Sequence, residues 1–228
     1  MREREHQRAV IVASGGPPPG ATEHHYILDI VTDEDLLVAA NGGTSILMAL
    51  GLQPDAIVGD LDSLSAADRD RLTGSPFDKL FRYPREKDKT DSQLAIEFAA
   101  SVDGIREIVV CGAFGDRFDH GLALTLYASV LTRDTDLVIT LTDGAQTVFG
   151  VKDEAQLRGR PGDIVSLIPL TGTVTDVHIE GFKYPLSGSD LSWGQTLGVS
   201  NELTGTTGQI SVRGDGMLLV VHRTRDAV

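Results

Sequence analysis

The feature that most constrains the fold of this chain is a short apolar run ending in a glycine-bearing polar loop, which occurs four times in the first 120 residues. The run and loop pairs cover residues 9–13 and 14–16, 36–40 and 41–43, 56–58 and 59–63, and 108–111 and 112–120. Short apolar runs of this kind are typical of buried strands in a parallel sheet. Because ligands of open α/β sheets bind at the carboxyl ends of the strands, we expect the four loops to line one crevice.

Helical signals between the runs support an α/β architecture. Thr90-Asp91-Ser92-Gln93 has the form of a capping box, and apolar residues such as Leu94 and Phe98 then recur at helical spacing. Residues 137–141 are a fifth candidate strand. We therefore predict an N-terminal three-layer α/β/α domain with a mostly parallel sheet over residues 1–145.

Beyond about residue 145 the helical periodicity disappears, and short β-like runs alternate with turns. The candidate strands are residues 164–168, 174–179, 197–200, 209–213 and 217–222. Gly214-Asp215-Gly216 predicts a hairpin turn between the last two of them. Short strands at this spacing favour an antiparallel β-sandwich or barrel, which we assign to residues 146–228.

Composition narrows the possible partners and compartment. A hydrophobic content of 41% is that of an ordinary soluble globular protein, and no apolar run approaches the length of a membrane span. The first residues lack the apolar core of a signal peptide, so we expect a cytoplasmic location and no membrane partner. A net charge of −13 argues against binding to nucleic acid. The single cysteine, Cys111, excludes an intrachain disulfide and is interpreted as a small buried hydrophobic residue.

Two carboxylates follow directly after the run 56–58. Asp60 and Asp62 lie on the same side of the chain if the extended geometry continues, and they repel each other unless a cation sits between them. Hard oxygen ligands of this kind suit Mg²⁺ shared with substrate phosphates. An acidic surface turn is the alternative. Asp91 falls in the first turn of a predicted helix, where capping is an alternative to metal binding and is compatible with it.

Four motifs in this order and spacing resemble the thiamin pyrophosphokinase family. They are Asn41-Gly42-Gly43, residues 59–63 (Gly-Asp-Leu-Asp-Ser), residues 87–91 (Lys-Asp-Lys-Thr-Asp) and residues 112–120 (Gly-Ala-Phe-Gly-Asp-Arg-Phe-Asp-His). Residues 181–186 and 198–202 resemble late motifs of the same family. The resemblance covers nearly the whole chain except its first few residues.

The resemblance implies a nucleotide-binding α/β domain and a thiamine-binding β domain. It also implies a homodimer whose active sites are shared between subunits. The implied reaction moves the β,γ-diphosphoryl group of ATP to the hydroxyl of thiamine and releases AMP. Mg²⁺ is the implied cofactor, with Asp60, Asp62 and Asp91 as its ligands.

The same resemblance implies the other site residues. Asp62, Asp91 and Arg117 are the implied catalytic residues, with Asp62 or Asp91 as candidate acceptors of the hydroxyl proton. Ser200 and Asn201 are the implied thiamine contacts. The residues implied on the nucleotide side are Asn41, Gly42, Gly43, Asp88, Thr90, Asp119 and His120.

Each of these roles has a structural alternative. Arg117 could form a surface ion pair with Asp116 or Asp119, and His120 could cap or pack the helix that it opens. The pair Ser200-Asn201 suits a turn as well as an aminopyrimidine. Two aromatic residues, Tyr184 and Trp193, could stack on the thiamine heterocycle or pack in the core.

Two positions depart from the family pattern. The first glycine loop commonly carries aspartate where this chain has Asn41. An amide there supplies no charge for direct metal binding, but it can still form a hydrogen bond to nucleotide or water. Asp116 replaces one glycine of the pair that usually precedes the arginine, which adds a negative charge near the expected phosphates. The competing functions are a related diphosphokinase with a pterin alcohol as acceptor and a catalytically silent nucleotide- or metal-binding regulator.

Overall fold

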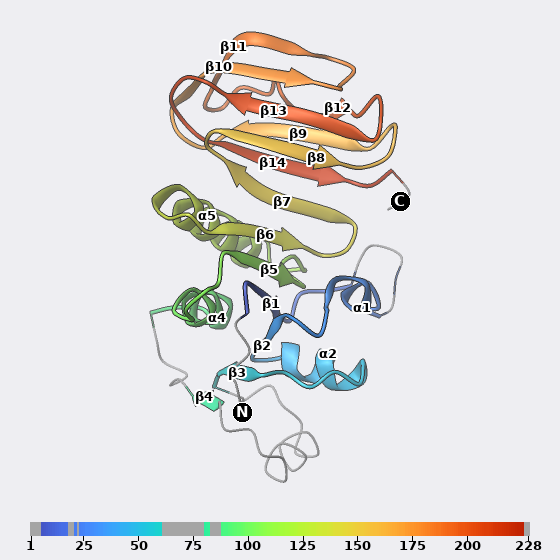
Figure 1. Cartoon of the computed structure of the whole chain (residues 1–228), viewed down its shortest axis with the longest axis vertical. Coiled ribbons are helices and arrows are strands. Elements are labelled where there is room, and N and C mark those ends of the chain that lie inside the picture. Colours follow the sequence, from blue (N-terminus) through green and yellow to red (C-terminus); the bar gives the residue numbers. More distant parts are fainter. Residues whose placement is uncertain (1–5, 18–20, 22, 61–79, 83–87, 226–228) are drawn as a thin grey trace. The chain divides into compact units, whose positions relative to one another are not determined.

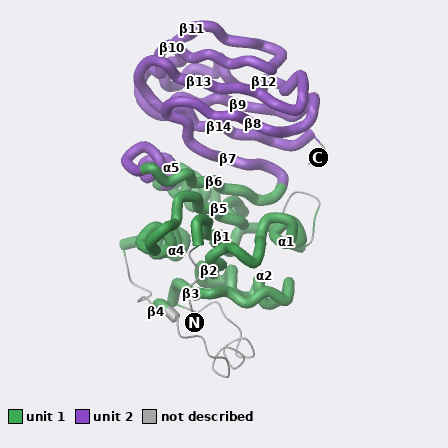
Figure 2. The backbone as a smooth tube through the Cα atoms, in the orientation of Figure 1, with its two compact units in different colours: residues 1–127, 136–144 green, residues 128–135, 145–228 purple. Residues whose placement is uncertain are grey.

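The computed structural model describes residues 6–17, 21, 23–60, 80–82 and 88–225, and the chain forms two compact units (Figures 1 and 2). Unit 1 comprises residues 1–127 and 136–144, and unit 2 comprises residues 128–135 and 145–228. Each unit has its own hydrophobic cluster and is described separately.

Unit 1 contains a parallel sheet in the order β6-β5-β1-β2-β3-β4. Its strands are β1 (Arg8–Val12), β2 (Leu36–Ala40), β3 (Ala56–Gly59), β4 (Leu80–Arg82), β5 (Glu107–Cys111) and β6 (Val138–Thr142). The chain builds outward from β1 through β4 and then returns to place β5 on the other side of β1. The strand order therefore reverses between β1 and β5, and such a switch point opens a crevice at the carboxyl ends of the strands.

Strands β1, β2, β3 and β5 are buried along nearly their whole length, as the sequence predicted for a parallel sheet. Residues 9–12 of β1 have no exposed surface, and Cys111 at the end of β5 is equally buried. Burial raises the pKa of the Cys111 thiol to about 12, so this cysteine is the buried hydrophobic residue that the sequence indicated.

The helices of unit 1 begin at the carboxyl edge of the sheet or connect its strands. They are α1 (Tyr26–Ile30), α2 (Gly43–Ala49), α4 (Asp91–Ala100) and α5 (Phe118–Asp134), of which the last continues into unit 2. The predicted N-cap of α4 is present, since Thr90 Oγ1 accepts a hydrogen bond from the Gln93 N–H at 3.2 Å. The Gln93 side chain donates to Glu97 at 3.0 Å, which links the first and second turns.

Unit 2 consists mainly of two antiparallel groups of strands. The first, in the order β12-β9-β14-β7, contains β7 (Gln146–Val151), β9 (Ile164–Pro169), β12 (Asn201–Glu202) and β14 (Leu218–Arg223). The second, in the order β11-β10-β13-β8, contains β8 (Glu154–Arg158), β10 (Thr173–Glu180), β11 (Leu186–Ser192) and β13 (Thr207–Val212). One buried cluster draws side chains from both groups, including Val165 of β9 and Ile210 of β13. The chain therefore has the predicted α/β fold, with a second region of antiparallel strands.

The predicted hairpin at Gly214-Asp215-Gly216 is wrong. β13 pairs with β10 and β8, whereas β14 pairs with β7 and β9, so the turn carries the chain from one group of strands to the other. The turn bonds to β10 instead of closing on itself, since Thr175 N–H donates to the Asp215 carbonyl at 2.9 Å and Asp215 N–H to Thr175 Oγ1 at 2.9 Å.

The predicted strand over residues 197–200 is also wrong, because this segment is a series of turns. Val199 N–H donates to the Thr196 carbonyl at 3.0 Å, and Ser200 has a φ of 60°, which an extended strand does not allow. Conversely, β7, β8 and β11 had no strand assignment from the sequence. The polar run at residues 152–154 includes the connection between β7 and β8.

In the part of the chain that the structure describes, no helix has the length and apolar character needed to cross a membrane.

Candidate active site

The loops that follow β1 and β5 meet at the switch point of the unit 1 sheet. Ala13 N–H donates to the Cys111 carbonyl at 2.9 Å, and Gly15 N–H donates to the Gly112 carbonyl at 2.9 Å. A Cβ on Gly15 would lie 2.2 Å from the Gly112 oxygen, so the two backbones approach each other only because a side chain is absent. The absence of a side chain at Gly15 therefore allows the two loops to lie in direct backbone contact.

A cavity of about 280 Å³ opens between these loops and the first turns of α4 and α5. Its lining residues are Ala13, Ser14, Gly15, Thr90, Ser92, Gly112, Ala113, Gly115, Asp116, Arg117, His120, Gly121 and Leu124. Backbone N–H groups at helix N-termini favour anions, and the guanidinium of Arg117 adds a full positive charge. The cavity thus suits a phosphate chain, and Thr90, Arg117 and His120 all line it. Their contact with a nucleotide stays a prediction.

Arg117 is held by a neighbouring carboxylate. Its Nη2 lies 2.6 Å from Asp119 Oδ2 and its Nε lies 3.2 Å from Oδ1, with both side chains more than 60% exposed. The hydrogen bond to Asp119 raises the pKa of Arg117, and Arg117 lowers the pKa of Asp119. The surface ion pair that the sequence left as an alternative is therefore present. An exposed pair is weak, so it leaves the guanidinium available for exchange onto a stronger anion.

Next to this cavity, the side-chain amide of Asn41 donates hydrogen bonds to two carboxylates, those of Asp60 and Asp91. Asn41 Nδ2, just after β2, donates to Asp60 Oδ1 at 3.1 Å and to Asp91 Oδ2 at 3.0 Å. Asp60 follows β3, and Asp91 is the first residue of α4. The structure thus brings together Asp60 and Asp91, the pair that the family resemblance implied as metal ligands. The third predicted ligand, Asp62, lies outside the described residues.

Gly59 makes room for this cluster. Its φ is 147°, and a Cβ there would lie 3.0 Å from Asn41 Cβ and 3.2 Å from Asp91 Oδ1. Both the backbone conformation and the close approach call for glycine.

The donor set fits a hard divalent cation. Mg²⁺ in nucleotide enzymes usually binds one or two carboxylates together with waters and substrate phosphates. Two convergent carboxylates beside a cavity with phosphate-binding character supply that arrangement. Within the described ranges, His, Cys, Asp and Glu form no cluster of three that could hold a metal.

The remaining predicted residues on the nucleotide side differ in their surroundings. Asp88 is exposed, one position before the lysine that pairs with Glu97. Gly42 and Gly43 open α2, and a Cβ on Gly43 would lie 1.8 Å from the Val12 carbonyl oxygen. Gly43 therefore has a packing requirement that is independent of any ligand.

In unit 2, Asn201 is almost fully buried and its amide bonds to backbone groups. Its Oδ1 accepts from Tyr184 N–H at 3.0 Å and Glu202 N–H at 2.9 Å, and its Nδ2 donates to the Tyr184 carbonyl at 2.8 Å. Ser200 N–H donates to Ser166 Oγ at 3.0 Å. The turn role that the sequence left open is present for Ser200, whereas Asn201 begins strand β12. Contact of either residue with thiamine stays a prediction.

The two aromatic residues are on the surface, so the alternative of core packing is wrong for both. Tyr184 is 60% exposed and Trp193 is 76% exposed. Lys183 Nζ lies 5.6 Å from the centroid of the Tyr184 ring, which shows that this ring can accept a cation on its face.

One residue of the site had no signal in the sequence. The Tyr26 hydroxyl accepts a hydrogen bond from the Gly112 N–H at 2.8 Å and so supports the loop after β5. Burial raises the pKa of Tyr26, which keeps the hydroxyl neutral. No local pattern distinguishes Tyr26 from other residues of an apolar helix face.

Two family models match the chain. The thiamin pyrophosphokinase catalytic domain matches residues 27–148, more than half of the sequence, and the thiamin pyrophosphokinase vitamin B1 binding domain matches residues 151–217. The thiamine pyrophosphokinase of Bacillus subtilis strain 168 is 29% identical over 199 residues, which is 83% of this chain and 87% of that protein.

Solved structures with the same fold carry similar descriptions. The crystal structure of thiamine pyrophosphokinase from Bacillus subtilis has a TM-score of 0.81 and 26% identity, covering 95% of this chain and 99% of the other. That of thiamin pyrophosphokinase from Geobacillus thermodenitrificans has a TM-score of 0.78 and 28% identity, covering 96% and 98%.

Proposed function

The chain belongs to the thiamin pyrophosphokinase family, and we propose that it transfers the diphosphoryl group of ATP to the hydroxyl of thiamine, giving thiamine diphosphate and AMP. The family matches to both a catalytic and a vitamin B1 binding domain support the two substrates. The observation that carries the proposal at the level of residues is the convergence of Asp60 and Asp91 on Asn41 beside a cavity suited to phosphates.

Residues 1–145 are proposed as the nucleotide domain and residues 146–228 as the thiamine domain. The layers expected from the sequence, α/β/α in the first and a β-sandwich in the second, are part of this proposal. The buried cluster shared by the two antiparallel groups of strands supports the sandwich.

Asp60 and Asp91, together with Asp62, would hold Mg²⁺. When bound, the cation supplies neutralisation of the charge that develops on the transferred phosphates. The other residues proposed to contact the nucleotide are Asn41, Gly42, Gly43, Asp88, Thr90, Asp119 and His120.

The chemistry left to the protein is positioning and electrostatic stabilisation, since diphosphoryl transfer needs an in-line arrangement of donor and acceptor. Arg117 binds phosphate oxygens with its planar fork by exchanging its contact with Asp119 for one with the substrate. Asp62 or Asp91 accepts the proton of the thiamine hydroxyl.

Ser200 and Asn201 are proposed to orient the aminopyrimidine, and Tyr184 and Trp193 to offer ring faces to the cationic heterocycle. The exposure of both rings and the net charge of −13 support a positively charged acceptor.

We also propose a cytoplasmic homodimer with shared active sites. A row of exposed apolar side chains on α5 supports an interface, because monomers rarely leave such rows uncovered. The row consists of Phe118, Leu122, Leu126 and Val130, exposed by 78%, 45%, 47% and 46%. Sedimentation at micromolar concentration tests the dimer, and a fully active monomer would contradict the shared site.

The direct test of the reaction is release of AMP from ATP with Mg²⁺, measured with and without thiamine. We expect release that depends on both. AMP release only with a pterin alcohol would instead identify the related diphosphokinase. If the folded protein releases no AMP with either acceptor, the chain is a silent binding protein.

A further inference from the structure

We propose that Asn41 is a positioning residue that holds Asp60 and Asp91 in a cation-ready arrangement before any cation is bound. This inference rests on the proposed role of the two carboxylates as Mg²⁺ ligands. In this chain the residue that joins the two like charges is the uncharged Asn41, at a position where the family commonly has an aspartate.

The backbone fixes the direction of the Asn41 side chain. Asn41 N–H donates to the Val58 carbonyl at 2.8 Å, and its carbonyl accepts from Thr44 N–H at 3.1 Å, so the residue is anchored to β3 and to α2. Its φ of 45° lies in the left-handed region, which asparagine tolerates better than most residues. Few side chains could occupy this position without strain.

The amide group suits the task because one nitrogen carries two N–H donors. Each points to a different carboxylate, at 3.1 Å to Asp60 and at 3.0 Å to Asp91. An amide N–H carries no net charge and gives up no proton, so it does not neutralise the carboxylate that accepts it. The amide therefore joins the carboxylates while leaving their negative charges in place for a ligand.

Accepting one N–H leaves a carboxylate able to bind a cation as well. An ionised carboxylate has two oxygens and about four lone-pair sites. Asn41 and Mg²⁺ can therefore act on the same carboxylates at once. An arrangement that already exists in the metal-free protein binds tighter, because less ordering remains for the cation to impose.

The test compares Asn41→Gly and Asn41→Asp with the wild-type protein. Glycine accepts a φ of 45° without strain, so Asn41→Gly removes the amide and keeps the backbone. Gln156→Glu is the matched control, because it converts an amide to an acid at an exposed position of β8. The readouts are the Kd for Mn²⁺ without nucleotide and the melting temperature in a chelator.

We expect Asn41→Gly to raise the Kd for Mn²⁺ about tenfold, equivalent to about 1.4 kcal/mol. Asn41→Asp adds a third carboxylate, so it should bind Mn²⁺ more tightly than the wild type and melt lower in the chelator. The gain in melting temperature on adding Mn²⁺ should then be largest for Asn41→Asp. Gln156→Glu should change neither readout.

Equal Mn²⁺ affinity in wild type and Asn41→Gly would overturn this inference and leave the proposed function standing. Failure of the wild type to bind Mn²⁺ without nucleotide would also overturn this inference, whereas the proposed function falls only if AMP release from ATP does not depend on thiamine and Mg²⁺. The Mn²⁺ titration and the AMP assay therefore distinguish the two failures.

Discussion

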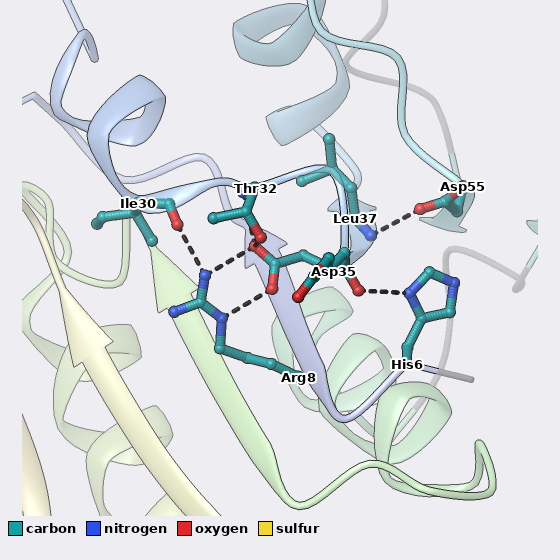
Figure 3. A network of polar contacts seen from close by, with 8 residues as sticks. His6, Arg8, Ile30, Thr32, Asp35, Leu37 and Asp55 are labelled. Carbon is teal, nitrogen blue, oxygen red and sulfur yellow. Dashed lines mark hydrogen bonds and ion pairs between the residues drawn. The ribbon is translucent and has the colours of Figure 1, made fainter. Parts of the chain in front are cut away.

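Carboxylates at the two ends of the parallel sheet in unit 1 accept hydrogen bonds from different kinds of side chain, a charged guanidinium at one end and a neutral amide at the other. At the amino end, before β2, Asp35 is almost fully buried and accepts hydrogen bonds from Arg8 Nε and Nη2 at 2.8 Å each (Figure 3). Thr32 adds its N–H at 2.7 Å and its hydroxyl at 3.0 Å. Burial alone raises the pKa of Asp35, but these hydrogen bonds and the charge of Arg8 outweigh it and lower the pKa.

At the carboxyl end, the partner that joins Asp60 and Asp91 is an amide and carries no charge. The negative charge of Asp35 is balanced within the protein and therefore serves the fold. Asn41 keeps the charges of Asp60 and Asp91 close without adding a charge of its own, and we propose that these two charges serve a ligand.

The largest expected effect is on catalysis at the carboxyl end. Asp91→Asn should lower turnover about 1,000-fold, about 4 kcal/mol in barrier height, because a metal ligand becomes neutral. The melting temperature should stay close to that of the wild type, since the loss of helix-dipole stabilisation is offset by relief of repulsion with Asp60. Rates of AMP release and thermal scans measure the two effects. An Asp91→Asn protein with wild-type turnover would remove Asp91 from the site.

The second effect is on stability at the amino end. Asp35→Ala leaves Arg8 without its partner, and we expect the free energy of unfolding to fall by about 3 kcal/mol while turnover per folded molecule is unchanged. Urea denaturation and active-site titration test this. Asp103→Ala, at an exposed position, is the control and should change stability by less than about 0.5 kcal/mol. Equal stability losses at the two positions would contradict the comparison.

A third effect separates two exposed ion pairs that look alike. Arg117→Ala should raise the KM for ATP about tenfold, because a guanidinium that binds phosphate is lost, and leave the melting temperature unchanged. Arg133 forms a similar exposed pair with Asp134 at the other end of α5, 2.7 Å from Nε to Oδ1. Arg133→Ala should change neither KM nor melting temperature. If both variants have the same KM, Arg117 has only a surface role.

The smallest effect is on the pH dependence of stability. The pKa of Asp35 is lower in the folded protein than its ordinary value of 3.8, so its contribution is fully present above about pH 4 and is lost as the pH falls through the folded pKa. Asp163 and Glu97 also have lowered pKa values and contribute in the same direction. The unfolding free energy of Asp35→Asn should therefore fall less steeply on acidification than that of the wild type. Parallel curves for the two proteins would show that Asp35 keeps its ordinary pKa.

The parallel sheet and its crevice were predictable because their signals are local. Each apolar run and its glycine-bearing loop are contiguous in sequence, and the parallel arrangement alone brings the loops to one edge. That arrangement accounts for Asn41 lying near Asp60, whereas the place of Asp91 beside them came from the family resemblance. The bridging role of the Asn41 amide followed from neither, because it depends on side-chain distances between three separate elements.

In unit 2 the local signals were misleading because the pairing is long-range. Gly214-Asp215-Gly216 has the composition of a hairpin turn, yet its hydrogen bonds go to Thr175 on a strand far earlier in the chain. Glycine-rich turns fix a reversal of direction and leave the choice of partner strand to packing. In unit 1, the hydrogen bond between Tyr26 and Gly112 was unpredictable for a different reason, because a single hydroxyl leaves no periodic pattern in the sequence.

The position of β1 between β2 and β5 has a consequence during synthesis. β2 follows β1 closely, whereas Cys111, the partner of Val12 on the other side, is translated roughly a hundred residues later. At about 5–20 residues per second, one side of β1 remains open on the ribosome for about 5–20 seconds. During that interval the growing polypeptide presents an apolar strand with unpaired amides, a template for unwanted association between nascent chains.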